Sequence, residues 1–497
     1  MNMSLYNRDS LHGNATNLLE FNDASLATAR IREIYDENVD KVKRRFAEFE
    51  AGDKSSPADD AFYPYLGLSI GPGDINISGK LAYGKLDAAG SFGATLTQPA
   101  LFESYYKEQI NLIMTNHKRP VVVGLSDRPM PLPFVIEAAS SNVSADDMPA
   151  LQSIFQMPNL ARINDNIANG TYIPPENGPR PLSLFTAQRV DYSLLRLSHY
   201  SGTAPEHFQR FVLFTNYQRY VDEFVQYGKG QVHNGDEYRA FVEPGNVVTP
   251  NPSFADIQPS GVAPTHLPQM PAYHLVRDKH MGITLVNIGV GPSNAKTITD
   301  HIAVLRPHCW LMIGHCGGLR RTQRLGDFVL AHAYVREDHV LDQDIHPSVP
   351  LPAIAEIQVA LTEAVARAAD TATESSNLKE HFRTGTVYTT DDRDWELRHK
   401  QLAMRFNQSR AIAVDMESAT IAANGYRFRV PYGTLLCVSD KPIHGEIKLP
   451  GMANKFYEGR TAQHLQIGID TLRQLRIGGV ESLHSRKLRS FDEPAFR

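Results

Sequence analysis

The second half of the chain alternates between two kinds of segment, and this alternation restricts the possible folds more than any other feature. From Ile283 to about Ile477, short apolar runs that suit β-strands are separated by runs with helical periodicity. Such alternation predicts βαβ units, in which helices cover a largely parallel sheet. The clearest unit begins with an apolar strand at residues 283–288, continues through a glycine turn into a helix, and returns as a strand at residues 310–313.

The first part of the chain also predicts an α/β arrangement. An apolar stripe over residues 26–49, closed by Gly52, predicts a helix, and residues 99–116 predict a second one. Residues 121–124 predict a strand, and residues 134–137 are a further candidate strand.

Shifts in composition suggest where the domains divide. Residues 140–182 are rich in Pro, Asn and Asp and predict irregular structure, whereas residues 191–226 have a helical pattern. Residues 228–271 are rich in Gly, Pro and Asn, which is typical of a domain connection. We therefore predict a smaller N-terminal α/β domain at residues 1–182, a helical connector and linker at 183–270, a C-terminal α/β domain at 271–480, and a polar tail at 481–497.

Charge and cysteine usage exclude several classes of function. The 497 residues carry a formal net charge of −5, which argues against general affinity for nucleic acid. No run of 18 apolar residues is present, and the polar residues 1–10 lack the apolar core of a secretory signal. Cys309, Cys316 and Cys437 lie in hydrophobic runs without the paired spacing of disulfides or of a metal site. We expect a cytoplasmic protein without a metal and without a membrane span.

Glycines gather where the first two predicted strands end. One strand is followed by Gly289-Val290-Gly291, and the next runs into Gly314-His315-Cys316-Gly317-Gly318. Glycines at the carboxyl ends of strands let backbone N–H groups face a ligand. Each motif alone is weak, because a glycine turn can simply pack a helix on a sheet, and His315 can be a core residue.

Two further predicted strands end in acidic residues. Asp415, Met416 and Glu417 follow one apolar strand, and Ser439-Asp440 ends another. A carboxylate is costly to bury without partners, and sugar hydroxyls would supply them. A desolvated aspartic acid has a raised pKa and can donate a proton. In the alternative interpretation, Asp415 caps a helix and Glu417 is exposed.

Three arginines, Arg320, Arg321 and Arg324, come directly after the second glycine-rich strand end. They fit either a solvated loop or a set of forked donors for a phosphate group.

In combination, these motifs resemble the purine nucleoside phosphorylase/nucleosidase superfamily and, within it, the AMP nucleosidase family. The combination is far more specific than any single motif. The matching segments occur in family order and extend the likeness over nearly the whole chain: residues 287–291, 314–319, 415–419 and 438–442, with residues 67–74, 81–85 and 214–218 outside the C-terminal part.

The resemblance implies a C-terminal three-layer αβα domain of the nucleoside phosphorylase type with a central mixed sheet. It implies hydrolysis of the N-glycosidic bond of AMP to adenine and D-ribose 5-phosphate. Asp440 would be the acid at purine N7, and Glu417, with Met416, would hold the ribose. It further implies a homohexamer that needs no cofactor, is activated by ATP, as its magnesium complex, and is inhibited by phosphate through the N-terminal domain.

Other residues are candidates for contacts to the substrate. Those for the nucleoside part are Gly291, His315, Gly317, Tyr388, Met416 and Ser439, with Trp395 as an alternative stacking residue to Tyr388. Those for the 5′-phosphate are Arg320, Arg321, Arg336 and Lys441, each of which can equally be a surface or interface residue.

Departures from the phosphorylase pattern favour water as the nucleophile. Met312 occupies the position where hexameric purine phosphorylases carry a phosphate-binding arginine, and a thioether cannot pair with phosphate. No Gly-Asp-Pro-x-Arg loop is evident before Ile283, nor is the strand from whose turn related nucleosidases take their water-activating carboxylate. Candidates for that carboxylate are Glu243, Glu337, Asp338 and Asp391.

Two other functions compete with hydrolysis. One is a purine nucleoside phosphorylase, and the other is a non-catalytic adenine-nucleotide sensor on the same fold. Retention of both Glu417 and Asp440 favours an enzyme, because a sensor needs no acid at N7.

Overall fold

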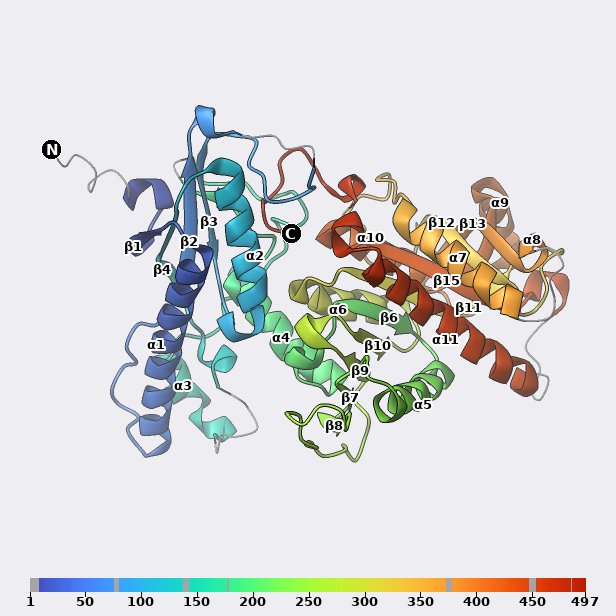
Figure 1. The fold of residues 1–497 in the computed structure, drawn as a ribbon, viewed down its shortest axis with the longest axis horizontal. Coiled ribbons are helices and arrows are strands. Elements are labelled where there is room, and N and C mark those ends of the chain that lie inside the picture. The colour runs from blue at the N-terminus through green and yellow to red at the C-terminus, as the bar shows by residue number, and fades with distance from the viewer. Residues whose placement is uncertain are drawn as a thin grey trace. The chain divides into compact units, whose positions relative to one another are not determined.

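The computed structural model describes residues 9–75, 80–136, 143–176, 178–371, 378–446, 453–483 and 485–497. The chain forms two compact units, each with its own sheet (Figure 1). The N-terminal unit comprises Met1–Leu195 with Ser490–Arg497, and the larger unit comprises Arg196–Arg489. Within the described ranges, no helix combines the length and apolar character needed to cross a membrane.

The N-terminal unit contains a five-stranded sheet and two long helices. The first helix begins where the side chain of Asp23 accepts a hydrogen bond from the Leu26 backbone at 2.9 Å, and it buries the predicted apolar stripe. The predicted helices at 26–49 and 99–116 and the strand at 121–124 are confirmed. In chain order the elements are β1 (Thr16–Phe21), α1 (Ala24–Glu50), β2 (Phe62–Ile70), β3 (Gly90–Thr95), α2 (Pro99–His117), β4 (Val121–Pro129), α3 (Met148–Ile154) and β5 (Arg180–Pro181), and α4 (Ala187–Ser201) begins in this unit and ends beyond Leu195, the last residue of the unit's first segment. The strand order is β1-β4-β2-β3-β5.

Two predictions for this unit are wrong. The candidate strand at 134–137 is not formed: Leu132–Phe134 is a short 3-10 helix entered through Pro131, and Glu137 lies outside the described residues. The end of the chain is not a solvated tail, because Phe496 is buried and its N–H donates to the carbonyl of Leu182 at 2.9 Å. One buried aromatic residue and paired backbone groups hold a segment whose composition is otherwise polar.

The larger unit is built on a ten-stranded mixed sheet with the order β14-β13-β12-β15-β11-β6-β10-β9-β7-β8. Strands β15, β11, β6 and β10 are parallel, whereas β9, β7 and β8 join the sheet as antiparallel strands. Because β14 pairs with both β13 and β11, the strands from β11 to β15 close into a ring. The strands are β6 (Phe211–Thr215), β7 (Ala240–Glu243), β8 (Val247–Pro250), β9 (Ala272–Val276), β10 (Ile283–Asn287), β11 (Cys309–Gly318), β12 (Phe328–Glu337), β13 (Phe382–Thr390), β14 (Ala411–Asp415) and β15 (Tyr432–Asp440).

Helices cover both faces of this sheet. Trp310 and Tyr432 lie against Gly425 of α10, whereas Gly433, the next residue along β15, lies against Ile357 of α7. Successive residues of a strand point to opposite faces, so α10 and α7 lie on opposite sides. The predicted three-layer arrangement around a mixed sheet is confirmed. The helices of this unit are α5 (Gln218–Asn234), α6 (Pro292–Ile302), α7 (Ala355–Thr371), α8 (Leu378–His381), α9 (His399–Ser409), α10 (Ser418–Phe428) and α11 (Ala453–Ile477), and α7 and α11 lie side by side in Figure 1.

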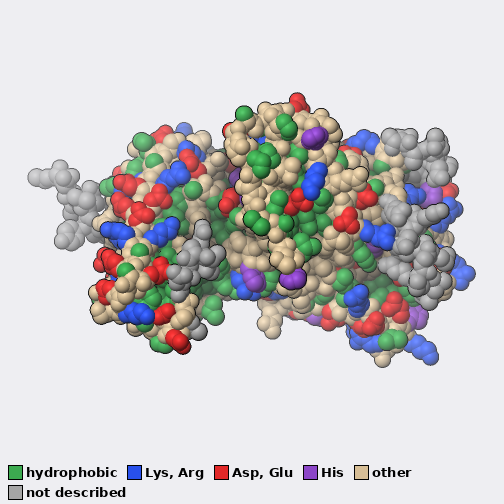
Figure 2. Space-filling view, turned by 90° about the horizontal axis from the view of Figure 1, so that it is seen from below, with side chains coloured by type: hydrophobic (Ala, Val, Ile, Leu, Met, Phe, Trp, Pro, Cys, Tyr) green, Lys and Arg blue, Asp and Glu red, His purple; other side chains and the backbone are tan. Residues whose placement is uncertain are grey.

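Residues 196–270 belong to the larger unit and are not a separate connector. The segment predicted as helix at 191–226 contains β6, which is fully buried between β10 and β11. The segment predicted as a linker contains β7 and β8. On the face drawn in Figure 2, acidic and basic side chains are interspersed over the described surface.

Candidate active site

The ends of several strands bring the sequence motifs together. Because β6, β10, β11 and β15 are parallel, the residues that follow them meet at one edge of the sheet. Gly317 of β11 is the register partner of both Asp440 in β15 and Val414 in β14. The two acidic motifs therefore lie on either side of the glycine-rich strand end.

Glu417 is held in a fixed position at this edge. Its side chain is buried, with the whole residue 1% exposed, and one carboxylate oxygen accepts a hydrogen bond from the Gly291 backbone at 2.7 Å. The other accepts from the Asn216 amide at 3.0 Å. Gly291 has φ +114°, a conformation that favours glycine, so the predicted glycine turn aims its N–H at the carboxylate. The interpretation of Glu417 as an exposed residue is wrong.

The N-cap of α10 is Glu417, without a side-chain cap hydrogen bond, and Asp415 lies two residues before it. The Asp415 carboxylate accepts hydrogen bonds from the Ser418 backbone at 2.9 Å, from the Ser418 hydroxyl, and from the Thr389 hydroxyl at 2.6 Å. Burial raises the pKa of Asp415. Burial, followed by the nearby charge of Asp415, raises the pKa of Glu417 to about 8.

This pKa shift predicts how stability depends on pH. The folded protein holds the Glu417 proton more tightly than the unfolded chain, so raising the pH from about 5 to about 8 costs folding free energy. The E417Q variant lacks this cost. Its free energy of unfolding, relative to the parent, is expected to rise over that range by a few kcal/mol, at about 1.4 kcal/mol per pKa unit. Urea unfolding of both proteins at several pH values measures the difference, and a pH-independent offset between them would contradict it.

Asp440 is half-buried at the end of β15. The Ser439 hydroxyl donates to one oxygen of the Asp440 carboxylate at 2.7 Å, and it lies 3.3 Å from the Cys316 carbonyl. A register shift between Cys316 and Gly317 places Gly317 opposite Asp440. The pKa of Glu396 is raised, mainly by burial and in part by the nearby charge of Asp440. The Asp440 carboxyl group is therefore oriented by its neighbouring hydroxyl and has a second acid nearby.

Sequence reasoning did not identify Asn216 and Tyr217 as site residues. Both follow β6, and the ring of Tyr217 lies 4.6 Å from that of His315, centroid to centroid. His315 is buried against Tyr217 and Tyr220 at the predicted strand end. The family-like segment 214–218 was the available signal, but it was not connected to the site because β6 was not recognised as a strand.

Two predicted site residues are engaged elsewhere. Tyr388 is buried in an apolar cluster, where its ring packs edge-on against Phe406 at 4.9 Å, and Trp395 packs against the same ring at 5.5 Å. Arg336 is also buried, and it donates to the carbonyls of Ile345 and His346 and pairs with Asp342 at 3.2 Å. Both side chains are therefore buried and make these contacts within the larger unit.

The remaining cation candidates differ in exposure. Arg320, half-buried, and Arg321, exposed, directly follow β11. Lys441 is buried, and its ammonium group pairs with Glu446 at 2.6 Å. Arg320 and Arg321 are therefore the cation candidates with the most accessible charge.

Met416, a candidate for contact with the ribose, is half-buried beside Glu417.

The four candidate water-activating carboxylates, of which Glu337 and Asp338 are adjacent in the chain, have different partners. Glu243 pairs with Lys229 at 2.9 Å, Glu337 pairs with Arg405, and Asp391 is exposed. Asp338 is buried, accepts a hydrogen bond from Thr420 in α10, and has a pKa raised by burial. None of the four has a hydrogen bond to Glu417 or Asp440 among the contacts of the described residues.

Comparisons with known proteins cover both units. A family model described as the bacterial AMP nucleoside phosphorylase N-terminus matches residues 26–179, and one for the phosphorylase superfamily matches residues 266–455. AMP nucleosidase from Escherichia coli K12 is 50% identical over 479 residues, which are 95% of this chain and 98% of that protein. Guanosine phosphorylase from Halorubrum lacusprofundi is 25% identical over 35% of this chain and 69% of its own. A crystal structure of AMP nucleosidase from Bacteroides thetaiotaomicron aligns with a TM-score of 0.42 at 26% identity, covering 58% of this chain and 98% of that one.

Proposed function

The chain belongs to the AMP nucleosidase family, and from that premise we propose that it hydrolyses the N-glycosidic bond of AMP to adenine and D-ribose 5-phosphate. The observation that carries the proposal is the buried Glu417, held by Gly291 and Asn216, at the strand edge that also presents Asp440. One acid can face the sugar while the other faces the base.

Asp440 is the proposed acid. As the bond between C1′ and N9 breaks, its electron pair moves into the adenine ring, and the ring becomes a much better leaving group when N7 gains a proton. The Asp440 carboxyl supplies that proton, and its orientation by Ser439 supports the role. Solvent restores the proton after adenine leaves.

Glu417 is the proposed ribose ligand. The departing base leaves an electron-poor, oxocarbenium-like sugar. A fixed carboxylate beside it stabilises this positive charge more strongly in a buried site than in water. Hydrogen bonds from ribose hydroxyls would favour the ionised form of Glu417 and lower its pKa when substrate binds.

Water is the proposed nucleophile, and the side-chain carbonyl of Asn216 is the proposed acceptor that orients it. That oxygen is buried and accepts no hydrogen bond within the described part of the chain. It lies 3.1 Å from the position that a Cβ atom on Gly314 would occupy. Met312, buried in β11, offers no charge to a phosphate nucleophile. The water oxygen bonds to C1′ and releases its proton to solvent.

A product assay separates the competing functions. In phosphate-free buffer the enzyme is expected to release adenine and ribose 5-phosphate from AMP. A phosphorylase would require phosphate and form a sugar 1-phosphate, and a sensor would bind AMP without turnover. Either of these results would contradict the proposal.

The 5′-phosphate is expected to bind at Arg320 and Arg321. Their guanidinium groups follow β11 and can form paired hydrogen bonds to phosphate oxygens. We expect R320Q or R321Q to raise KM for AMP about tenfold, the loss of roughly one charge-assisted contact, and to leave KM for adenosine nearly unchanged. Steady-state kinetics with both substrates measures this, and equal changes for the two would show that these arginines do not contact the phosphate.

Further properties rest on the family resemblance and remain proposals. They are a homohexameric assembly, activation by ATP as its magnesium complex, and a cytoplasmic location, which the three buried cysteines, none of them in a disulfide, also favour.

A further inference from the structure

The side chain of Glu417 does not cap the helix that it begins. Glu417 occupies the N-cap position of α10, where its carbonyl accepts the first helical hydrogen bond, from the Ile421 N–H at 3.0 Å. A side chain at this position commonly accepts a hydrogen bond from an N–H of the first turn. Within the described residues, Glu417 makes no such bond, because its carboxylate is held by Gly291 and Asn216 in the candidate active site.

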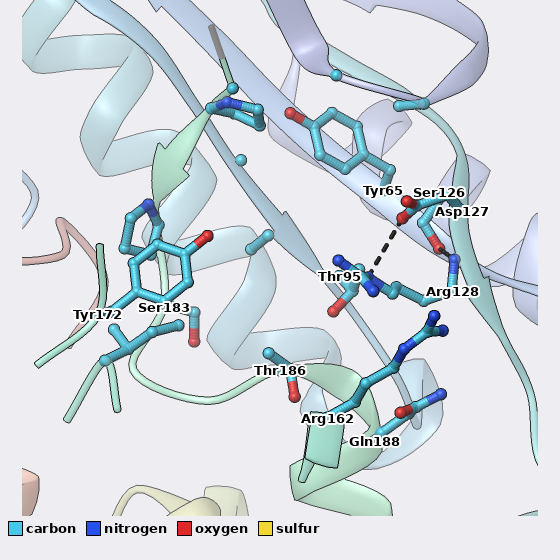
Figure 3. A pocket seen from close by; sticks show the side chains of 18 of the residues that line it. Tyr65, Thr95, Ser126, Asp127, Arg128, Arg162, Tyr172, Ser183, Thr186 and Gln188 are labelled. Carbon is cyan, nitrogen blue, oxygen red and sulfur yellow. Dashed lines mark hydrogen bonds and ion pairs between the residues drawn. The ribbon is translucent and has the colours of Figure 1, made fainter. Parts of the chain in front are cut away.

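Helix α4 of the N-terminal unit has the more usual arrangement. The hydroxyl of Thr186, the residue before the helix, accepts a hydrogen bond from the Arg189 N–H at 3.4 Å. Thr95, at the end of β3, accepts from the Ala187 N–H at 3.0 Å, and Figure 3 shows both threonines. The start of α10 has only the second kind of contact in the described part of the chain, from side chains that precede the helix. It therefore depends more strongly on them.

Thr389, on β13, provides that contact. It is buried and is the register partner of Asp415 in β14. Its hydroxyl accepts a hydrogen bond from the Ala419 backbone N–H at 3.0 Å and donates to one oxygen of Asp415 at 2.6 Å. The other oxygen of Asp415 accepts from the Ser418 N–H at 2.9 Å. One hydroxyl therefore pairs the second N–H of the helix and orients the carboxylate that pairs the first.

These contacts fix the backbone next to Glu417. Ser418 and Ala419 are the two residues that follow it, so a shift of the first turn would move the Glu417 carboxylate away from the Gly291 N–H, which lies at 2.7 Å. Replacing the Thr389 hydroxyl with a methyl group would leave a buried N–H and a buried carboxylate oxygen without this partner. Such groups are costly in a protein interior, which favours a shift of the first turn.

We propose that Thr389 is a positioning residue for the reaction, which holds the first turn of α10 so that the Glu417 carboxylate faces the ribose. This inference rests on the proposed role of Glu417. Thr389 acts through the backbone of the helix and does not touch the substrate. The hydroxyl group, and not the volume of the side chain, is the feature that the position requires.

Two variants at this position test the need for the hydroxyl. T389V keeps the shape of the side chain and removes both hydrogen bonds. We expect kcat for AMP to fall about tenfold to a hundredfold and KM to change less than about threefold, because a small displacement of a group that acts in the transition state costs mainly rate. T389S keeps the hydroxyl and is expected to retain kcat within a few fold. Steady-state adenine release measures both constants.

T284V is the matched control for loss of a buried hydroxyl. Thr284, on β10, is also buried, and its hydroxyl accepts from the Gln209 backbone N–H at 2.8 Å and lies 2.9 Å from Nδ1 of His274. Both valine variants are expected to unfold at a lower urea concentration than the parent. Only T389V is expected to lose kcat, and an equal loss in T284V would reduce Thr389 to a residue that supports stability alone.

A double-mutant cycle shows whether Thr389 acts through Glu417. In the E417A background, T389V is expected to cause little further loss of kcat/KM, since the group that it positions is gone. A further loss as large as that in the parent, unchanged kcat in T389V, or an equal loss in T389S would overturn the proposal. Parental kinetics in E417A would overturn the proposed role of Glu417 as well, whereas a loss in E417A with parental kinetics in T389V would overturn this inference alone.

Discussion

Replacing Asp440 with asparagine is expected to lower kcat for AMP about a thousandfold while AMP affinity changes only a few fold. Asparagine preserves the shape and the hydrogen bond from Ser439, but it has no proton to give to N7 as the glycosidic bond breaks. Steady-state adenine release measures kcat, and equilibrium titration with AMP measures affinity.

The matched control is E396Q, which removes the neighbouring acid whose pKa responds to Asp440. It is expected to retain kcat within a few fold. Near-parental turnover in D440N would remove Asp440 from the mechanism, and a large loss in E396Q would transfer the acid role to that residue.

Replacing Glu417 with alanine is expected to lower kcat/KM by about a hundredfold to a thousandfold. The variant loses the carboxylate that is aimed by Gly291 and Asn216, and with it the stabilisation of positive charge on the sugar. The loss is expected mainly in kcat, because the charge develops in the transition state.

Two further variants sharpen this test. N216A is expected to give a smaller loss of kcat/KM. It removes one of the two hydrogen bonds to Glu417 and the proposed acceptor for water. E363Q, an exposed glutamate of α7, is the control and is expected to behave as the parent. Circular dichroism confirms that each variant is folded. Parental kinetics in folded E417A would contradict the role of Glu417.

Much of the larger unit could be predicted because its strands end in distinctive residues. The run from β10 through α6 to β11 has an apolar strand, a glycine turn and an amphipathic helix in sequence, and each signal is local. Strands β14 and β15 were predicted for the same reason, since an acidic residue ends each apolar run. Local patterns were sufficient where each element carries its own boundaries.

Strand β6 could not be predicted in this way. Its five residues, Phe211–Thr215, are all buried between two other strands, so they lack the alternation that marks a half-exposed strand. A short apolar run of this kind is indistinguishable by periodicity from part of a buried helix. Missing β6 also hid Asn216 and its contact with Glu417.

The engagement of Arg336 and Tyr388 depended on tertiary contacts. Arg336 donates to backbone carbonyls of a loop, and every residue type has such a carbonyl, so the sequence does not indicate this contact. Tyr388 lies on a strand whose neighbouring helix α9 supplies Phe406, and the sequence does not indicate which face of the strand meets that helix. In both cases the residue type suggested a contact with substrate, whereas tertiary packing determines which protein groups the side chain contacts.

A crystal structure with an uncleavable carbon-linked analogue of AMP tests the central claim most directly. The account predicts that the Asp440 carboxyl lies within hydrogen-bond distance, about 2.6–3.2 Å, of the position equivalent to N7, with Glu417 at the ribose hydroxyls. An analogue bound with its base turned away from Asp440, or with its ribose out of reach of Glu417, would contradict it.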